Sequence, residues 1–183
     1  SRNLLTHLKA AVYLKKYFPA VRFAVSCVHS TAVNTVEKCL KEAGLNLGDD
    51  VLTVPKHLTY PMMNECKAAL AKSGTVTLEL ALRRKPTVVT YQLTALNKFI
   101  AKYFMRVNLP HYCIVNILQE QMVFPEFIDV NLPVNAIGEQ LHLLYSEGLH
   151  RDACIEGCRK MSASLGCQQS ARSAVKAIGD LFA

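Results

Sequence analysis

Tryptophan is absent from the 183-residue sequence, and charged residues make up only 19% of it. Hydrophobic residues account for 51%, so the chain is too apolar for a disordered protein and long enough to bury a core. No apolar run approaches the roughly 18 residues of a membrane-spanning helix, because charged residues interrupt every run earlier. The sequence therefore excludes a disordered chain and a spanning helix, and it favours one globular domain or one lobe of a larger enzyme.

Motifs of common catalytic and metal chemistry are also missing. The sequence has no G-x-S-x-G elbow, P-loop, G-x-G-x-x-G loop, H-E-x-x-H pair or C-x-x-C pair. Its seven cysteines are an odd, scattered set, which is typical of buried thiols in a reducing cytosol. Cys154 and Cys158 would share a helix face, but with Cys167 and His150 they lack the paired spacing of a zinc site. We therefore expect no bound metal.

Positive charge is in excess. Lys and Arg number 21 against 14 Asp and Glu, which gives a formal net charge of +7. This balance favours an anionic partner, which could be a phosphate, a nucleic acid or an acidic membrane surface. Because no nucleic-acid recognition motif is present, we expect no nucleic-acid partner.

Apolar periodicity predicts strands that alternate with helices. The expected strands cover residues 21–28, 51–54, 68–71, 87–91 and 112–118, the last as a strand or a strand-to-loop segment. The expected helices cover residues 4–14, 30–43, 59–67, 76–84, 94–106, 134–147, 150–165 and 169–182. The alternation predicts one Rossmann-like α/β domain over residues 1–183, with a parallel sheet, right-handed crossovers and a helical C-terminal end. Ligands of such sheets bind where strands end and helices begin.

One such junction lies at Ser73, Gly74 and Thr75, between a short apolar strand and a helix. Free amides at a helix start favour a phosphate, and glycine lets the backbone approach it closely. The hydroxyls of Ser73 and Thr75 can donate to phosphate oxygens, and Glu79, one turn later, could accept from ribose hydroxyls. The pattern alone also suits an ordinary helix cap followed by a solvated glutamate.

A second candidate is the basic, aromatic segment 96–107. Lys98, Lys102 and Arg106 recur every four residues and form a cationic stripe, while Phe99 and Tyr103 belong to its large apolar groups. Such a helix can lie on an anionic membrane surface. It can equally be a crossover helix with buried aromatics and solvated lysines.

A third candidate is Asn116, a polar residue inside the apolar run 114–118. A buried amide must be hydrogen-bonded or lie at the mouth of a strand. The residue therefore suits either a ligand contact or an ordinary turn.

The run KSGTVTLELALRRKPTVVTY, at residues 72–91, resembles the donor-side lobe of lipid-A-disaccharide synthase, an inverting glycosyltransferase family of the two-lobed GT-B type. The segment 96–106 is similar to the family's aromatic and basic segment, and Asn116-Ile117-Leu118 with Val123 and residues 125–128 resembles its N-L-L … V-P-E-L-L signature. The likeness covers most of residues 4–129. Val115 stands where the family has proline, and residues 119–121 (Gln-Glu-Gln) stand where it usually has A-G-R.

The resemblance implies a specific reaction, in which UDP-2,3-diacylglucosamine donates its sugar to the 6-hydroxyl of 2,3-diacylglucosamine 1-phosphate. It implies that Ser73, Gly74 and Thr75 bind the diphosphate, that Glu79 orients the ribose or uridine, and that Asn116 holds the donor. It further implies no cofactor, no metal and a cytoplasmic location at the periphery of the inner membrane, with contacts from Lys98, Phe99, Lys102, Tyr103 and Arg106. The family's catalytic acidic residue belongs to an acceptor lobe that this sequence lacks, so we expect an inactive C-terminal fragment of a longer enzyme.

Two alternatives stay open from the sequence. The chain could be the lobe of another UDP-sugar protein of the same architecture, such as a peptidoglycan-precursor transferase or a UDP-N-acetylglucosamine epimerase. It could also be a nucleotide-binding and membrane-docking module without catalysis.

Overall fold

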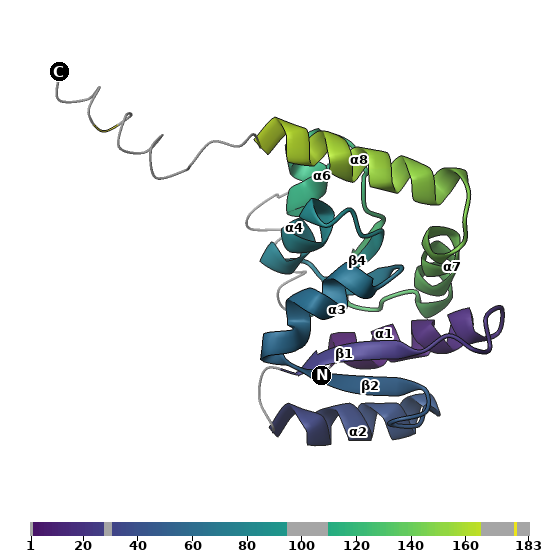
Figure 1. Ribbon diagram of the computed structural model, residues 1–183. Helices are drawn as coiled ribbons and strands as arrows, with labels where there is room; N and C mark the ends of the chain where they lie inside the picture. The colour runs from purple at the N-terminus through teal and green to yellow at the C-terminus, as the bar shows by residue number, and fades with distance from the viewer. Residues whose placement is uncertain (1, 28–30, 95–109, 166–177, 179–183) are drawn as a thin grey trace.

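The computed structural model describes residues 2–27, 31–94, 110–165 and 178. Its elements, in chain order, are α1 (Arg2–Lys15), β1 (Phe23–Cys27), α2 (Thr31–Ala43), β2 (Val51–Pro55), η1 (Lys56–Leu58), α3 (Thr59–Glu65), β3 (Ala69–Lys72), α4 (Thr75–Leu82), β4 (Thr87–Gln92), α6 (Ile114–Gln119), β5 (Glu126–Asp129), α7 (Val134–Tyr145) and α8 (Leu149–Leu165). Helices pack around parallel strands (Figure 1), which confirms the predicted α/β class.

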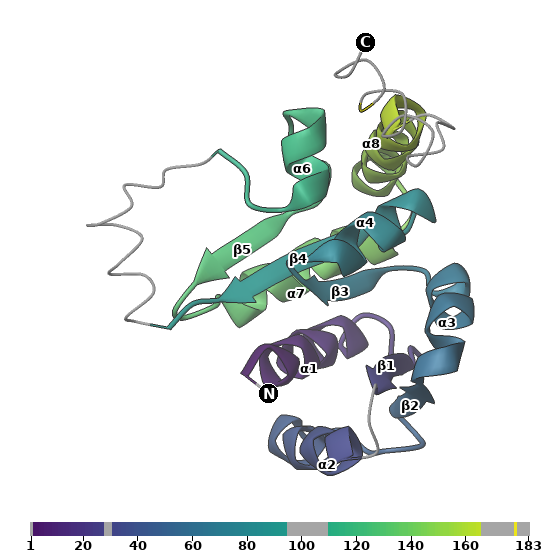
Figure 2. The same ribbon diagram turned by 90° about the vertical axis from the view of Figure 1, so that its left-hand side faces the viewer.

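The strands form two parallel sheets within the described residues. In the smaller sheet β1 pairs with β2, from Phe23 opposite Val51 to Cys27 opposite Pro55. In the larger sheet the order is β3-β4-β5, and β4 is the central strand. Figure 2 shows the larger sheet with its three strands running side by side. Their carboxyl ends therefore share one edge, which we call the carboxyl edge.

Burial explains why β4 is a strand. Residues 87–90 are Thr-Val-Val-Thr and are all fully buried. Branched side chains pack well on a pleated sheet that is covered on both faces. The hydroxyl of Thr87 donates to the Lys85 carbonyl at 2.8 Å, and that of Thr90 lies 2.6 Å from His7 Nε2. The buried hydroxyls of Thr87 and Thr90 thereby have hydrogen-bond partners.

Helix α1 packs against both sheets. Its Leu8 belongs to the core that contains Val51 of β2, whereas its Leu14 belongs to the core that contains Val89 of β4. On its other side α1 packs closely on α7, where a Cβ built on Gly138 would come within 2.6 Å of Tyr13 Cγ. The glycine is required at this position because any side chain would clash with the tyrosine ring.

One predicted element is wrong and one was missed. Residues 112–118 were expected as a strand or a strand-to-loop segment, but α6 covers most of them, with Val115 and Asn116 buried while Ile117 and Leu118 are exposed. The branched residues Ile114, Val115 and Ile117 favour a strand locally, and tertiary contacts override that preference. Strand β5 at Glu126–Asp129 was not predicted as a strand. The predicted helices at 94–106 and 169–182 lie, apart from Thr94 and Ile178, outside the described residues.

Candidate functional site

The loop between β3 and α4 adopts the predicted strand–glycine–helix arrangement. Gly74 has φ 157° and ψ −169°, a backbone region that is essentially restricted to glycine. A Cβ built on Gly74 would have no heavy atom within 4 Å, so open space adjoins the backbone here. Glycine is needed for the conformation, and the space beside it lets another molecule approach the main chain.

The amides of this loop are arranged around the start of α4. The N–H of Ser73 donates to the Thr90 carbonyl at 2.9 Å, which fixes the loop to the end of β4. Thr77 donates both its N–H (3.1 Å) and its hydroxyl (2.7 Å) to the Gly74 carbonyl. The first amides of a helix have no intrahelical acceptor, and in α4 these belong to Thr75 and Val76. Gly74 and Thr75 are exposed, so this positive end of the helix faces solvent.

Two charged side chains flank the loop. Glu79 is half-buried on α4, four residues after Thr75 and on the same helix face. Lys72 is exposed directly before the loop, with its Nζ 5.1 Å from the centroid of the Tyr91 ring. Sequence reasoning missed Lys72; its position next to Ser73 was the signal that could have identified it. The loop thus has a cation on one side and a carboxylate one turn further along the helix.

The side chain of Asn116 is hydrogen-bonded within the protein. It is fully buried in α6, where its Nδ2 donates to the Phe124 carbonyl at 2.8 Å. Its Oδ1 accepts from the N–H groups of Val123 at 3.0 Å and Phe124 at 2.9 Å. These three bonds hold the turn that leads from α6 into β5. They account for the polar residue in an apolar run, and the predicted contact of Asn116 with a donor stays a prediction.

The segment before α6 lies next to the loop. The Ser73 hydroxyl donates to the Tyr112 carbonyl at 3.4 Å. The Glu126 carboxylate accepts from the N–H of Cys113 at 2.7 Å and from that of Tyr112 at 3.2 Å. Through these bonds Glu126 satisfies amides at the start of α6. His111 Nδ1 lies 3.5 Å from the same carboxylate. Sequence reasoning noted Glu126 only as part of a signature and missed this function.

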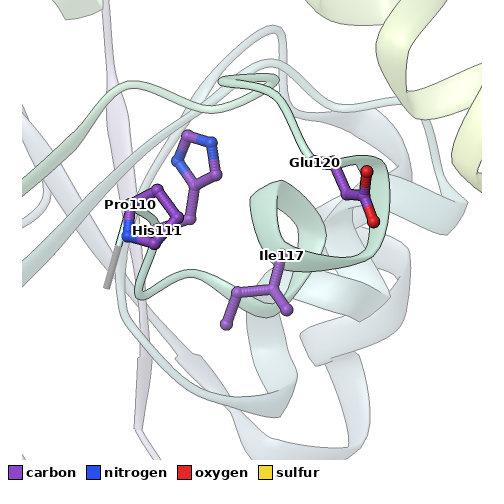
Figure 3. A pocket seen from close by; sticks show the side chains of 4 residues that line it. All are labelled: Pro110, His111, Ile117 and Glu120. Carbon is purple, nitrogen blue, oxygen red and sulfur yellow. The ribbon is translucent and has the colours of Figure 1, made fainter. Parts of the chain in front are cut away.

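A hollow of about 510 Å³ adjoins this segment and is lined by Pro110, His111, Ile117 and Glu120. Figure 3 shows the His111 ring and Glu120 on opposite sides of it. The exposed apolar side chains of Tyr112, Ile114 and Leu118 lie on the same stretch of chain. The surface next to the loop is therefore partly apolar.

The first turns of α1 also lie at the carboxyl edge. Asn3 Oδ1 accepts from the N–H of Gln92, the last residue of β4, at 3.1 Å. His7 packs one turn further on, against Thr90, and burial lowers its pKa from 6.5 to about 4. His7 is consequently neutral at physiological pH and contributes no positive charge to this edge.

The remaining candidates are the membrane-contact residues, a metal site and the cysteine pair on α8. The predicted membrane contacts Lys98, Phe99, Lys102, Tyr103 and Arg106 lie outside the described residues. Among the described residues, no three His, Cys, Asp or Glu side chains are grouped in a way that could hold a metal ion, and no helix is long and apolar enough to span a membrane. Cys154 and Cys158 are buried together on α8, and their hydrogen bond, with burial, raises the pKa of the Cys158 thiol. These two thiols are core residues.

Comparison with known proteins identifies the family. The family model for lipid-A-disaccharide synthetase matches residues 1–178. The lipid-A-disaccharide synthase of Chlamydia pneumoniae is 34% identical over 164 residues, which is 88% of this chain and 26% of that protein. The lipid-A-disaccharide synthase of Chlamydia muridarum is 49% identical over 75 residues, which is 41% of this chain and 12% of that protein. The lipid-A-disaccharide synthase of Prochlorococcus marinus is 34% identical over 113 residues, which is 62% of this chain and 29% of that protein.

The chain spans about a quarter of the length of the Chlamydia pneumoniae protein. The match nevertheless covers the whole described structure, including the β3–α4 loop, α6 and β5. On this basis the chain belongs to the lipid-A-disaccharide synthetase family.

Proposed function

We propose that this chain is the donor-nucleotide-binding lobe of a two-lobed lipid-A-disaccharide synthase. The observation that carries the proposal is the exposed helix start at Gly74 and Thr75, with open space beside the glycine. Backbone amides and a helix dipole at the carboxyl edge of a parallel sheet favour a diphosphate. Membership of the lipid-A-disaccharide synthetase family supports a nucleotide sugar as the molecule that brings this diphosphate.

The proposed reaction transfers a sugar from UDP-2,3-diacylglucosamine to 2,3-diacylglucosamine 1-phosphate. The 6-hydroxyl oxygen of the acceptor forms a bond to the anomeric carbon, the bond from that carbon to the diphosphate breaks, and the hydroxyl proton passes to a base in the other lobe. UDP leaves with the electron pair of the broken bond. Amide dipoles directed at the diphosphate stabilise the negative charge that develops on it and lower the barrier.

Individual residues have distinct roles in this proposal. The amides of Gly74 and Thr75, with the hydroxyl of Thr75, bind the diphosphate. The Ser73 hydroxyl joins them by exchanging its long 3.4 Å bond to the Tyr112 carbonyl for a phosphate oxygen, and Lys72 adds a positive charge beside it. Glu79 accepts hydrogen bonds from the ribose hydroxyls. Asn116 acts as a positioning residue, because its bonds hold the turn that joins α6 to β5.

The acylated substrates require access to a membrane. We assign this contact to Lys98, Phe99, Lys102, Tyr103 and Arg106, and place the protein in the cytoplasm at the inner membrane. Each cation near an anionic surface contributes about 1 kcal/mol, so three of them support reversible attachment. Reversing the charges of Lys98, Lys102 and Arg106 should abolish co-sedimentation with anionic vesicles. Reversing the exposed Lys38, Lys41 and Lys160 should change it much less. Equal losses in the two variants would contradict the assignment.

UDP binding tests the proposal directly. Millimolar UDP should raise the melting temperature of the chain, whereas ATP should raise it less. Gly74→Ala should weaken UDP binding by about tenfold or more, because a Cβ strains the backbone and intrudes on the diphosphate. Gly48→Ala is the matched control, since Gly48 has φ 92°, open space around it and a place outside the loop. Absence of a UDP effect, or equal losses of affinity in both variants, would contradict the nucleotide role.

Turnover distinguishes the lobe from a complete enzyme. The purified 183-residue chain should form no disaccharide, because the base and the acceptor site belong to the other lobe. Product formation by this chain alone would refute the assignment to a single lobe.

A further inference from the structure

A group of cations lies at the end of the larger sheet that is opposite the carboxyl edge. Helix α4 starts at the carboxyl end of β3 and runs back along the sheet, because β4, which follows it, is parallel to β3. The turn at residues 83–86 therefore lies at the opposite end of the sheet, which we call the amino edge. Figure 2 shows α3 and the end of α4 on this side, away from the arrowheads of β4 and β5.

The turn carries three consecutive cations, Arg83, Arg84 and Lys85. Two of them reach across to α3: Arg83 Cζ lies 4.6 Å from the centroid of the Tyr60 ring, and Lys85 Nζ donates to the Asn64 carbonyl at 2.5 Å. Neither contact neutralises a charge, because the ring and the carbonyl carry none. Among the residues that the structure describes, none of the three cations takes part in an ion pair, so their charges are available to a partner.

Arg84 occupies a backbone position that suits glycine better. Its φ is 54°, and the N–H groups of Arg84 and Lys85 donate to the carbonyls of Ala81 at 2.8 Å and Leu80 at 3.0 Å. These two bonds form a Schellman motif, in which the left-handed residue is usually glycine. An arginine there is sterically strained, and its side chain is exposed. No contact among the described residues accounts for a cation at this position.

Exposed apolar side chains adjoin these cations. Tyr60 is 53% exposed and Leu82 is 48% exposed, whereas Met63 of α3 and Leu80 of α4 are buried in one cluster. Tyrosine and arginine are enriched in protein interfaces, where they contribute much of the binding energy. The surface therefore combines positive charge with the side chains of a protein interface. We call it the amino-edge patch, and it consists of Tyr60, Leu82, Arg83, Arg84 and Lys85.

The charge of the amino-edge patch favours an anionic partner. Its three cations outnumber Glu65, the exposed carboxylate that ends α3. The next cation along the chain, Lys67, is already paired with Glu147 at 3.0 Å and belongs to no excess. Complementary charge accelerates the encounter of two proteins and fixes their orientation. The partner is thus expected to present several carboxylates or phosphates.

The position of the patch decides between a protein and a membrane as this partner. In the proposed function, on which this step rests, acylated substrates pass from a bilayer to the β3–α4 loop at the carboxyl edge. A flat bilayer at the amino edge would lie at the opposite end of α4, and the loop would face away from the lipid. The segment 96–107, assigned above to the membrane, also follows the carboxyl end of β4. An acidic protein segment fits the amino edge better than a bilayer does.

We propose that the amino-edge patch binds an acidic segment of another protein. Carboxylates of the segment pair with Arg83, Arg84 and Lys85, and its apolar side chains cover Tyr60 and Leu82. Arg83 already lies against the tyrosine ring, so it loses less side-chain freedom when the segment binds. The segment attaches at the far end of α4 and leaves the β3–α4 loop accessible.

A defined peptide tests this proposal on the 183-residue chain. The probe is a short fluorescein-labelled peptide in which pairs of glutamates alternate with single leucines, and fluorescence anisotropy measures its affinity. Reversing the charges of Arg83, Arg84 and Lys85 together should weaken binding by about tenfold or more. The matched control reverses three exposed cations elsewhere and should weaken binding by about twofold or less. These control positions are Lys38, Lys41 and Lys160.

The apolar part of the patch has its own measurement. A second peptide with serine in place of leucine should bind more weakly than the first. Tyr60→Ala should remove most of the difference between the two peptides, because the leucines would lose the ring that they cover. If Tyr60→Ala leaves the difference unchanged, the peptide binds elsewhere and the assignment to this patch is wrong.

Arg84 provides a variant that keeps the fold intact. Arg84→Gly relieves the left-handed backbone, so it should raise the melting temperature by about 2 to 4 °C while it weakens peptide binding by about threefold. Arg84→Lys keeps the charge and should bind the peptide as tightly as the unsubstituted chain. Undiminished binding by Arg84→Gly would overturn the inference.

Other outcomes also decide the matter. Absence of peptide binding, or equal losses in the two charge-reversed variants, would refute a specific patch. Co-sedimentation with vesicles of phosphatidylcholine and phosphatidylglycerol that is lost only when the patch is reversed would assign it to a membrane instead. Millimolar UDP should raise the melting temperature of the patch variant as much as that of the unsubstituted chain. A failure of the nucleotide role and a failure of the patch are therefore observed separately.

Discussion

Protonation of His7 should destabilise the fold between neutral and mildly acidic pH. Its imidazole is enclosed by α1 and β4, with Nε2 2.6 Å from the Thr90 hydroxyl, and burial lowers its pKa from 6.5 to about 4. Because the folded pKa lies below the unfolded one, the unfolded chain binds the proton more tightly. The contribution of neutral His7 to stability is complete above the unfolded pKa and is lost as pH falls toward the folded pKa.

The size of the effect follows from the shift. The two pKa values differ by about 2.5 units, so the whole loss is about 3 kcal/mol, of which about 2 kcal/mol occurs between about pH 7.5 and pH 5. Denaturant unfolding at several pH values measures it. His7→Gln keeps a polar group near Thr90 but does not titrate, so the stability of this variant should decline less on acidification. His57→Gln, at an exposed position, should follow the unsubstituted chain. Parallel pH profiles for His7→Gln and the unsubstituted chain would refute the reasoning.

Three further substitutions test the packing that positions the site, each by denaturant unfolding. Asn116→Ala should cost about 3 kcal/mol, because it removes three buried hydrogen bonds and leaves the amide and the carbonyl of Phe124 without partners, while the Val123 N–H keeps its bond to the Gln121 carbonyl; a cost below 1 kcal/mol, about one ordinary hydrogen bond, would contradict its structural role. Gly157→Ala should cost about 2 kcal/mol, since the new Cβ would lie 2.7 Å from Val123 Cγ1, and an unchanged midpoint would show that the side chain moves aside freely. Glu126→Ala should cost about 2 kcal/mol through the freed amides of Tyr112 and Cys113, whereas Glu126→Gln, which keeps an acceptor, should cost less.

Most of the fold was predictable because local pattern and burial agree. The run Thr87–Tyr91 is apolar or branched throughout and forms the central strand, as predicted. Gly44 follows the last residue of α2, as predicted, and takes φ 72° there. Pro86 lies in the turn between α4 and β4, where the helix was predicted to have ended. The turn at Gly74, from β3 into α4, was also predictable. A strand that passes directly into a helix needs backbone freedom at the junction, and glycine provides it.

Residues 112–129 were not predictable in the same way. The apolar, branched run around Val115 has the composition of a strand, and only contacts with distant residues make it a helix. Glu126 reaches back to the amides before α6, and Asn116 reaches forward to Val123 and Phe124. Hydrophobic periodicity describes one segment at a time, so it cannot predict hydrogen bonds between two different segments.

The sequence by itself determined the class of the fold, the sequence of strands and helices, and the glycine loop at the end of β3, because periodicity, branching and glycine act within a few residues of chain. Only the tertiary structure decided that Asn116 is buried in a turn and that Lys72 and Tyr112 adjoin the loop. Those features depend on hydrogen bonds and contacts that form once helices and sheets have packed, a property that no local stretch of sequence contains.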